Sequence, residues 1–545
     1  MCFIDRCAIY RYIVSFILNV LGGRMNKLKY AVLLALCASS ANAEEASDAK
    51  IAKLQKMLEE QQIQMKAMAE ELKALQKQVP TITANQETVV PENKKVIQEQ
   101  QWQIQAMSEE LNALQQKPTV VANEKDGIGF KSSDGEFSIK LHGLVQVDNR
   151  SIDADSTAAA TDGWMIRKAR PWIEGSLFGW IDYRLTPEFA TTTANVANSS
   201  NGTTVSGRST LGTPEVIDAY FDAKFKPWFK VRVGKFKPFV GLARLQSDVD
   251  GKFLEQSFVT ANLLPQRDVG ASIFGDLLEG KVNYALGYSN GVIDGGDQSV
   301  ALDNNNDKEL TARVFAQPFK GDGSLLAGLG LGLAGTQINQ AGTTTSTQLP
   351  AYKSFSQLNF FSYNTNAFAD GKRTRFAPQA YYYYGPFGVM AEYAREDQAV
   401  TRGSNHETLT HNAWQTTFSY LLTGEEASYA GVKPRHAFKP NGEGWGAWEL
   451  VARYSEMNLD SDTFTGANTA TRFANISTAA KSAQAWGVGV NWYLNNYTRF
   501  ALDYENTSFE GGGAGSTVSA TTGAITKLVD RQDEHAMIGR LQVSF

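Results

Sequence analysis

Cysteine is almost absent from the sequence. The chain has 545 residues and 3 cysteines, Cys2, Cys7 and Cys37, all of which precede residue 44. A chain without cysteine can pass through an oxidising compartment without forming incorrect disulfides. The cysteine-free part therefore suits a protein that is exported to the periplasm or beyond it.

Long hydrophobic runs are also absent. The mean hydropathy is −0.29, and the run from 13 to 21 is shorter than the roughly 20 apolar residues that a membrane-spanning helix needs. Aromatic residues and glycine are plentiful, with 29 Phe, 20 Tyr, 10 Trp and 47 Gly. This composition excludes a helical membrane protein. It favours a membrane β-barrel, because only every second residue of a lipid-facing strand must be apolar.

Positive charge is not in excess. The formal net charge is −5, and it becomes about −9 without residues 1–43, which carry five basic groups and one acidic group. An acidic chain argues against nucleic acid as a partner. Any preference for anions must therefore come from the local placement of Arg and Lys.

Groups for catalysis or metal binding are scarce. The histidines are His142, His406, His411, His436 and His535. Two of them, at 406 and 411, share one apparent loop but lack the spacing of a metal site, and the glycine-rich run 511–515 lacks the Lys-Ser/Thr of a phosphate-binding loop. We therefore expect no enzyme activity, no cofactor and no metal.

A secretory signal begins at Met25. Lys27 and Lys29 form its basic region, residues 31–36 its apolar core, and residues 41–43 (Ala-Asn-Ala) its cleavage site. We expect Met25 to be the true start, residues 1–24 to be an upstream extension, and cleavage to follow Ala43.

The next segment, 44–125, has the pattern of a short periplasmic coiled coil. Apolar residues follow a heptad from 51 to 79, interrupted at Gln61, and a second amphipathic helix is expected from about 95 to 116. Residues 106–114 repeat residues 67–75 with small changes. The two helices either fold back on each other or associate between chains.

The remainder, 126–545, has the pattern of an all-β transmembrane antiparallel barrel. Apolar and polar residues alternate in many segments, for example 137–147, 164–185, 229–236 and 485–494. Short joints at 225–228 and 495–497 predict turns, and polar stretches predict external loops at 190–210, 294–308, 398–410, 458–480 and 508–527. About ten residues per membrane strand give about 16 strands. The last strand alternates up to its terminal Phe545, as in the closing strand of an outer-membrane barrel.

Alternation also predicts which charged residues face the lumen. Basic residues placed there are Lys168, Arg170, Lys230, Arg232, Arg313, Arg453 and Arg540. In 165–177 the odd positions are expected to face outward. Glu174, Glu449 and Asp503 are also expected to face the lumen. A cationic anion path and an ordinary mixed lumen both fit this pattern.

One stretch differs from the predicted external loops. Residues 240–268 carry Arg244, Lys252 and Arg267 among apolar residues such as Phe258 and Leu263. An external loop has little reason to be so apolar, so we expect this loop to fold into the barrel and narrow the pore.

Several motifs resemble the phosphate-selective porin O and P family. They are Arg167-Lys168-Ala169-Arg170 leading into Gly175-Ser176-Leu177-Phe178-Gly179-Trp180, Gly234-Lys235-Phe236-Lys237-Pro238, Thr423-Gly424-Glu425-Glu426, Gly446-Ala447-Trp448-Glu449-Leu450 with Arg453-Tyr454-Ser455, Val488-Gly489-Val490-Asn491-Trp492-Tyr493-Leu494-Asn495, and the closing strand. The resemblance implies a homotrimer of 16-stranded barrels in which basic residues draw anions to a constriction. It adds Lys235 and Lys237 to the candidate anion path, and it includes Lys168 and Arg170.

The leading hypothesis is an outer-membrane porin for passive, anion-preferring diffusion of phosphate or similar oxyanions in a Gram-negative bacterium. The alternative is a general or other solute-specific porin of mixed selectivity, with the coiled coil serving assembly or envelope spacing. The expected partners are small anions, outer-membrane lipid, two further copies of the chain, and the barrel assembly machinery, which would bind the strand ending in Phe545.

Overall fold

The structure is a computed structural model. It describes residues 119–123, 127–154, 162–190, 194–197, 204–207, 211–291 and 306–545, together with four single helical positions between 98 and 106. The predicted signal peptide and the three cysteines lie outside the described residues, as does the coiled coil apart from those four positions. None of the helices in the described ranges is long and apolar enough to span a bilayer.

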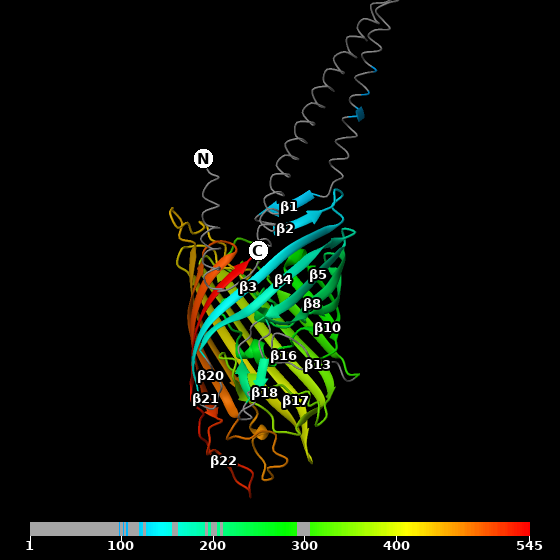
Figure 1. The fold of residues 1–545 in the computed structure, drawn as a ribbon. Coiled ribbons are helices and arrows are strands. Elements are labelled where there is room, and N and C mark those ends of the chain that lie inside the picture. The colour runs from blue at the N-terminus through cyan, green and yellow to red at the C-terminus, as the bar shows by residue number, and fades with distance from the viewer. Residues whose placement is uncertain are drawn as a thin grey trace, which may run out of the picture. The chain divides into compact units, whose positions relative to one another are not determined.

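The main sheet is a closed antiparallel barrel (Figure 1). It contains 18 strands, of which 16 form a ring that closes where β24 pairs with β3. In chain order the ring consists of β3 (Ser138–Asp153), β4 (Gly163–Leu177), β5 (Ile181–Ala190), β8 (Leu211–Lys226), β9 (Phe229–Phe236), β10 (Asp268–Leu277), β11 (Val282–Ser289), β12 (Glu309–Ala316), β13 (Leu329–Ala341), β16 (Phe368–Tyr384), β17 (Phe387–Arg402), β18 (Asn405–Leu421), β19 (Ala447–Asn458), β20 (Ala480–Tyr493), β21 (Thr498–Gly511) and β24 (Glu534–Ser544). The predicted barrel of about 16 strands is confirmed.

The two other strands, β1 (Thr119–Asn123) and β2 (Gly127–Lys131), precede the ring. β2 pairs with β3 at 138–141, and β24 pairs with β3 from Leu144 onward. Between these two pairings, Phe545 exchanges both backbone hydrogen bonds with Gly143, each 3.0 Å long. β2 therefore pairs with the first residues of β3, which the C-terminal strand β24 does not reach.

Connections differ between the two ends of the barrel. At the end that carries Phe545, here called the turn end, most are short: 178–180, 227–228, 278–281, 385–386 and 494–497. The opposite end, here called the loop end, carries the hairpins β6 (Ala194–Ala197)–β7 (Thr204–Gly207) and β22 (Thr517–Val518)–β23 (Ile525–Lys527) within longer connections. Figure 1 labels β22 at this end. Two connections contain a single turn of helix: η3 (Leu278–Gly280) lies at the turn end, between β10 and β11, and η4 (Ser461–Thr463) lies at the loop end, between β19 and β20. The turns predicted at 225–228 and 495–497 are confirmed within about two residues.

Two predicted segments were wrong. The loop expected at 398–410 is instead the tip of a long hairpin, because β17 and β18 are joined by residues 403–404 alone. The alternating run 164–185 is not one strand, since a turn at 178–180 separates β4 from β5. Gly179 in this turn has a φ of +69°, which glycine adopts without strain.

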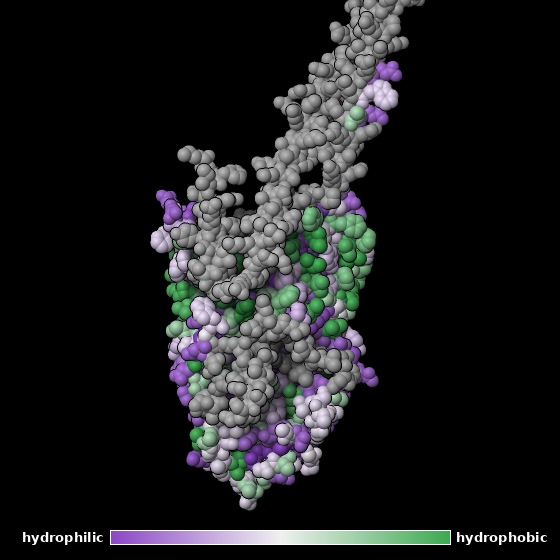
Figure 2. Space-filling view, viewed as in Figure 1, coloured by the Kyte–Doolittle hydropathy of each residue, from purple (hydrophilic) through white to green (hydrophobic). Residues whose placement is uncertain are grey.

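The outer wall is apolar, as the period of two requires. Val233, Leu286, Val314 and Leu333 are exposed on four different strands. Figure 2 shows that hydrophobic residues gather on the visible face over the part nearer the turn end, whereas hydrophilic residues dominate toward the loop end. A band of this kind matches the hydrocarbon layer of a bilayer.

Part of the interior is filled by the connection between β9 and β10, here called the inner loop (residues 237–267). It contains α4 (Leu242–Leu245) and the short π-helix η2 (Val259–Leu263), and its residues Val240, Phe258 and Leu263 are almost fully buried. The inward folding predicted from its apolar composition is therefore confirmed.

Two further connections join the inner loop inside the barrel, and neither was predicted. The connection 342–367, with β14 (Tyr352–Lys353) and β15 (Asn359–Phe361), stacks Phe355 on Phe258 at 4.8 Å between ring centroids. The connection 422–446 enters from the turn end and places Tyr429 against the inner loop. The hydroxyl of Tyr429 donates to the carbonyl of Leu242 at 2.6 Å.

Candidate functional site

The inner loop is fixed to the barrel wall by buried polar contacts. Nζ of Lys252 lies 2.6 Å from Oε1 of Glu449 on β19. The backbone N–H of Leu254 donates to Asp503 on β21 at 2.7 Å, and Arg540 on β24 donates to the carbonyl of Leu254 at 3.0 Å. Because these partners lie on different strands, the middle of the loop is held from several directions.

Arginines from three neighbouring strands surround the carboxylate of Glu255 in the inner loop. Arg167 on β4 binds it with two nitrogens at 2.9 and 3.0 Å, Arg150 on β3 also binds it, and Arg540 lies 4.0 Å away. Burial alone would raise the pKa of Glu255, but Arg167 and Arg150 outweigh it and hold the pKa well below its ordinary value. This carboxylate therefore stays ionised and anchors the loop.

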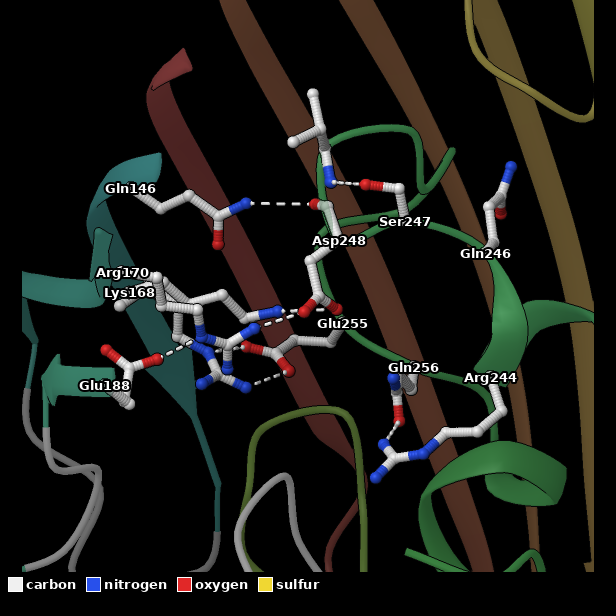
Figure 3. A network of polar contacts seen from close by, with 12 residues as sticks. Gln146, Lys168, Arg170, Glu188, Arg244, Gln246, Ser247, Asp248, Glu255 and Gln256 are labelled. Atoms are coloured by element: carbon white, nitrogen blue, oxygen red, sulfur yellow. Dashed lines mark hydrogen bonds and ion pairs between the residues drawn. The ribbon is translucent and has the colours of Figure 1, made fainter. Parts of the chain in front are cut away.

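A second group of basic residues surrounds Asp248, and Figure 3 shows two of its members, Lys168 and Arg170. Nζ of Lys168 lies 3.0 Å from Oδ1, Nζ of Lys237 lies 3.8 Å from the same atom, and Nη2 of Arg267 lies 3.7 Å from Oδ2. Arg170 binds Oδ2 as well. Lys168 and Arg170 come from β4, whereas Lys237 and Arg267 are the first and last residues of the inner loop.

Burial changes the charge of one member of this group. It lowers the pKa of Lys237 from 10.5 to about 7, although the carboxylates of Asp248 and Asp218 oppose the shift. In the described part of the chain, Asp248 is the only carboxylate that forms an ion pair with Lys237. Lys237 therefore changes its charge near neutral pH.

A cavity of about 570 Å³ opens beside this group, between the inner loop and a wall to which β3, β4, β5, β8, β9, β11, β12 and β16 contribute. Two acidic residues, Asp218 and Asp248, line it. The basic residues that line it are Arg170, Arg184, Arg232, Lys237, Arg267 and Arg313. In a medium of low dielectric such an excess of basic groups attracts anions.

A smaller cavity of about 80 Å³ lies between the inner loop and the wall that includes β17, β18, β19, β21 and β24. Its basic lining residues are Lys168, Lys252, Arg453, Arg499 and Arg540, and its acidic ones are Asp248 and Glu255. Residues 246–248 of the inner loop line both cavities. This short segment therefore separates two basic compartments of the lumen.

The two cavities account for most of the predicted residues. The larger is lined by Arg170, Arg232, Lys237, Arg267 and Arg313. The smaller is lined by Lys168, Lys252, Arg453 and Arg540. Of the remaining three, which line neither cavity, Lys230 pairs with Asp276 at 2.7 Å, Lys235 pairs with Glu215 at 3.6 Å, and the buried Arg244 binds Gln256 and Gln266.

The basic residues of the cavities are also hydrogen-bonded to the wall. Arg232 makes two bonds of 2.7 Å to Asp222, and its guanidinium lies 3.9 Å from the ring centre of Tyr220. In the described residues Arg313 forms no ion pair, and its Nε donates to Gln379 at 3.1 Å. Arg313 is therefore a lining cation that is not paired with a carboxylate in the described residues, and the same holds for Arg499, which donates to the carbonyl of Gly251 and to Gln542.

Sequence reasoning missed several lumenal arginines. Arg167 stands at an odd position of β4 and was expected to face outward, which was wrong. A bulge in the β3–β4 ladder between Gln146 and Val147 reverses the alternation, so that Trp164 is exposed and Arg167 is buried. Arg184 and Arg499 alternate with apolar residues within predicted strands, so the same face assignment would have found them.

A family model described as phosphate-selective porin O and P matches residues 139–545. The chain belongs to this family. Porin O of Pseudomonas aeruginosa is 24% identical over 459 residues, which cover 78% of this chain and 92% of that protein. The members of the family are channels of the Gram-negative outer membrane, and the chain is accordingly an outer-membrane porin.

Solved structures of other outer-membrane proteins are similar to this member of the porin O and P family. In-vitro folded OmpT of Vibrio cholerae, in its trimer form, has a TM-score of 0.44 and 12% identity, covering 75% of this chain and 99% of its own. The outer-membrane channel DcaP of Acinetobacter baumannii has a TM-score of 0.43 and 12% identity, covering 76% and 99%.

Proposed function

We propose that this porin is a passive, anion-preferring channel for phosphate or similar oxyanions, and that the inner loop and the wall facing it form its basic constriction. The observation that carries the proposal is the larger cavity, where basic lining residues outnumber acidic ones by six to two. Membership of a family described as phosphate-selective supports the same substrate class.

The proposed mechanism is replacement of hydration water by fixed donors. Guanidinium and ammonium groups donate charge-assisted hydrogen bonds to oxyanion oxygens. Arg313 and Arg232 would offer such bonds in the larger cavity, and Arg499 would do so in the smaller one. Several weak sites in series let an ion enter without being trapped.

A porin of mixed selectivity is the second candidate, and the ion pairs of the lumen favour it. Arg232 is paired with Asp222, Arg267 with Asp218, and Arg170 with Glu188. Each carboxylate reduces the field that its cation presents to a passing anion. The two candidates therefore differ in how far these pairs cancel the basic excess.

The zero-current potential of single channels in a potassium chloride gradient separates the two candidates. Refolded residues 44–545 are placed in a planar bilayer with a tenfold gradient. A potential close to the chloride equilibrium potential supports the anion channel. A potential near zero would favour the mixed porin, and one close to the potassium value would contradict both candidates.

We further propose that three copies assemble, with the turn end facing the periplasm and the strand that ends in Phe545 recognised by the barrel assembly machinery. The segment 44–125 would then serve assembly or spacing within the envelope. Deletion of 44–125 should leave single-channel conductance unchanged. Dissociation of trimers after this deletion would assign the segment to assembly, and intact trimers would assign it to spacing.

A further inference from the structure

The carboxylate of Asp248 lies at the meeting point of several basic side chains. Four basic residues from opposite ends of the inner loop and from β4 converge on its carboxylate, namely Lys168, Arg170, Lys237 and Arg267. The same carboxylate lines both cavities, so it stands where an ion would pass from one to the other.

The backbone of the turn that carries Asp248 is held independently of the carboxylate. Nε2 of Gln146 donates to the carbonyl of Asp248 at 3.3 Å, and Nε2 of Gln542 donates to that of Val249 at 3.1 Å. Gln246 donates to the carbonyl of Tyr429 at 2.7 Å. The side chain of Asp248 can therefore rotate away from its partners while the loop stays in place.

Two of the four basic residues would still be paired with another carboxylate if the side chain of Asp248 turned away. Arg170 also binds Glu188, and Arg267 binds Asp218 at 2.9 Å. Lys237 would lose its one ion pair in the described part of the chain. Rotation of one side chain would thus open a site with a clear excess of positive charge.

We propose that Asp248 is a built-in counter-ion that occupies the anion site between the two cavities and is displaced by each oxyanion that passes. The inference rests on the proposed function and names a residue that regulates the same site. Phosphate competes effectively because it offers more acceptor oxygens, and at neutral pH more negative charge, than a carboxylate. The returning carboxylate then speeds release, which prevents four fixed cations from trapping the ion.

Asp218 provides a matched control for the charge of Asp248. It lines the same larger cavity, but among the described residues it pairs with Arg267 alone. Asp218→Asn and Asp248→Asn remove the same charge with little change of volume. Only the second removes the group that competes for the shared position among four basic residues.

The test is the phosphate concentration that halves the chloride current through single channels at pH 6, where Lys237 is largely protonated. Asp248→Asn should lower this concentration on the order of tenfold, and it should lengthen the individual blocking events. Asp218→Asn should lower it by no more than about threefold. An equal effect of the two variants, or weaker block in Asp248→Asn, would overturn the proposal.

A second variant and a folding measurement keep the test decisive. Asp248→Ser also lacks the charge but is smaller, so it must shift the block in the same direction, and an opposite shift would count against the proposal. Correct folding is checked by heat-modifiable migration in gel electrophoresis. The result for the wild type separates this inference from the proposed function. If phosphate blocks the chloride current of the wild type and the half-blocking concentration is the same in the variants, the inference alone is overturned. Absence of block in the wild type and both Asp248 variants overturns both.

Discussion

Lys252 of the inner loop lies 2.6 Å from Glu449 of β19, and both side chains are buried. Glu449 also accepts hydrogen bonds from the hydroxyl of Tyr493 at 2.8 Å and from Asn491 at 3.3 Å. This pair ties the middle of the inner loop to the barrel wall, so the position of the loop depends on the negative charge of Glu449.

Lys252→Met should therefore destabilise the inner loop. The substitution leaves Glu449 buried without its cation, which costs about 3 to 5 kcal/mol when one partner of a buried pair is removed. Guanidinium unfolding of the refolded barrel measures the change. The double variant Lys252→Met/Glu449→Gln should recover part of the loss, because the introduced amide would keep an acceptor for Tyr493 without an uncompensated charge. An unaltered midpoint in the single variant would contradict this account.

Removal of Arg313 should reduce anion preference without unfolding the protein. In the described residues Arg313 forms no ion pair, so Arg313→Ala breaks no direct contact with a carboxylate. We expect the chloride-to-potassium permeability ratio to fall roughly twofold, since one lining cation is lost. Arg395→Ala is the control, because Arg395 is exposed and pairs with Asp397 rather than lining a described cavity. A similar fall in both variants would show that the effect does not arise in the lumen.

Anion preference should depend on pH near neutrality. Lys237 has a pKa lowered to about 7 by burial, so it gains a positive charge as the pH falls from 8 to 6. Its neighbours Asp248 and Asp218 favour that charge, whereas Arg267 and Arg244 oppose it. Burial raises the pKa of Asp250 in the same loop to about 6, so acidification also removes a negative charge there.

Both changes act in the same direction, and the permeability ratio for chloride over potassium should rise as the pH falls. Zero-current potentials between pH 5 and pH 9 measure this dependence. Lys237→Met should abolish the step near pH 7 and keep the one near pH 6. An unchanged profile in this variant would exclude Lys237 as the titrating group.

The two inward connections from the loop end should depend on one another. Phe258 of the inner loop stacks on Phe355 and lies 5.7 Å from Phe360 between ring centres, and all three are buried. Phe258→Ala should cost about 3 to 5 kcal/mol and increase the current noise, because both loops lose their shared core. Phe376→Ala is the control, since Phe376 is half exposed on the outer wall. Equal losses in the two variants would argue against a shared core.

The wall of the barrel could be predicted from the sequence because alternation is local. Strands such as β9 and β19 carry their face assignment in a few residues, and Arg232 and Arg453 were placed in the lumen correctly. The alternation is weaker in β13, because its glycines at 330, 332 and 335 dilute it. The orientation of Arg167 could not be predicted, because a bulge is set by pairing with a distant strand.

The interior was harder to predict than the wall. The inner loop was recognised by its apolar composition, and Phe355 and Phe360 gave the same signal for the connection 342–367, which was overlooked. Arginines from three strands converge on Glu255, and basic residues from both ends of the inner loop converge on Asp248. Most of these partners are far apart in the sequence. No local pattern contains such pairs.

The most direct test of the central claim is the chloride current through single channels of the refolded protein while phosphate is added. The account predicts that phosphate reduces the chloride current with saturation at full occupancy, and that Arg313→Ala raises the half-blocking concentration. A chloride current that falls only in proportion to dilution, or that is insensitive to phosphate, would contradict an oxyanion site in the lumen.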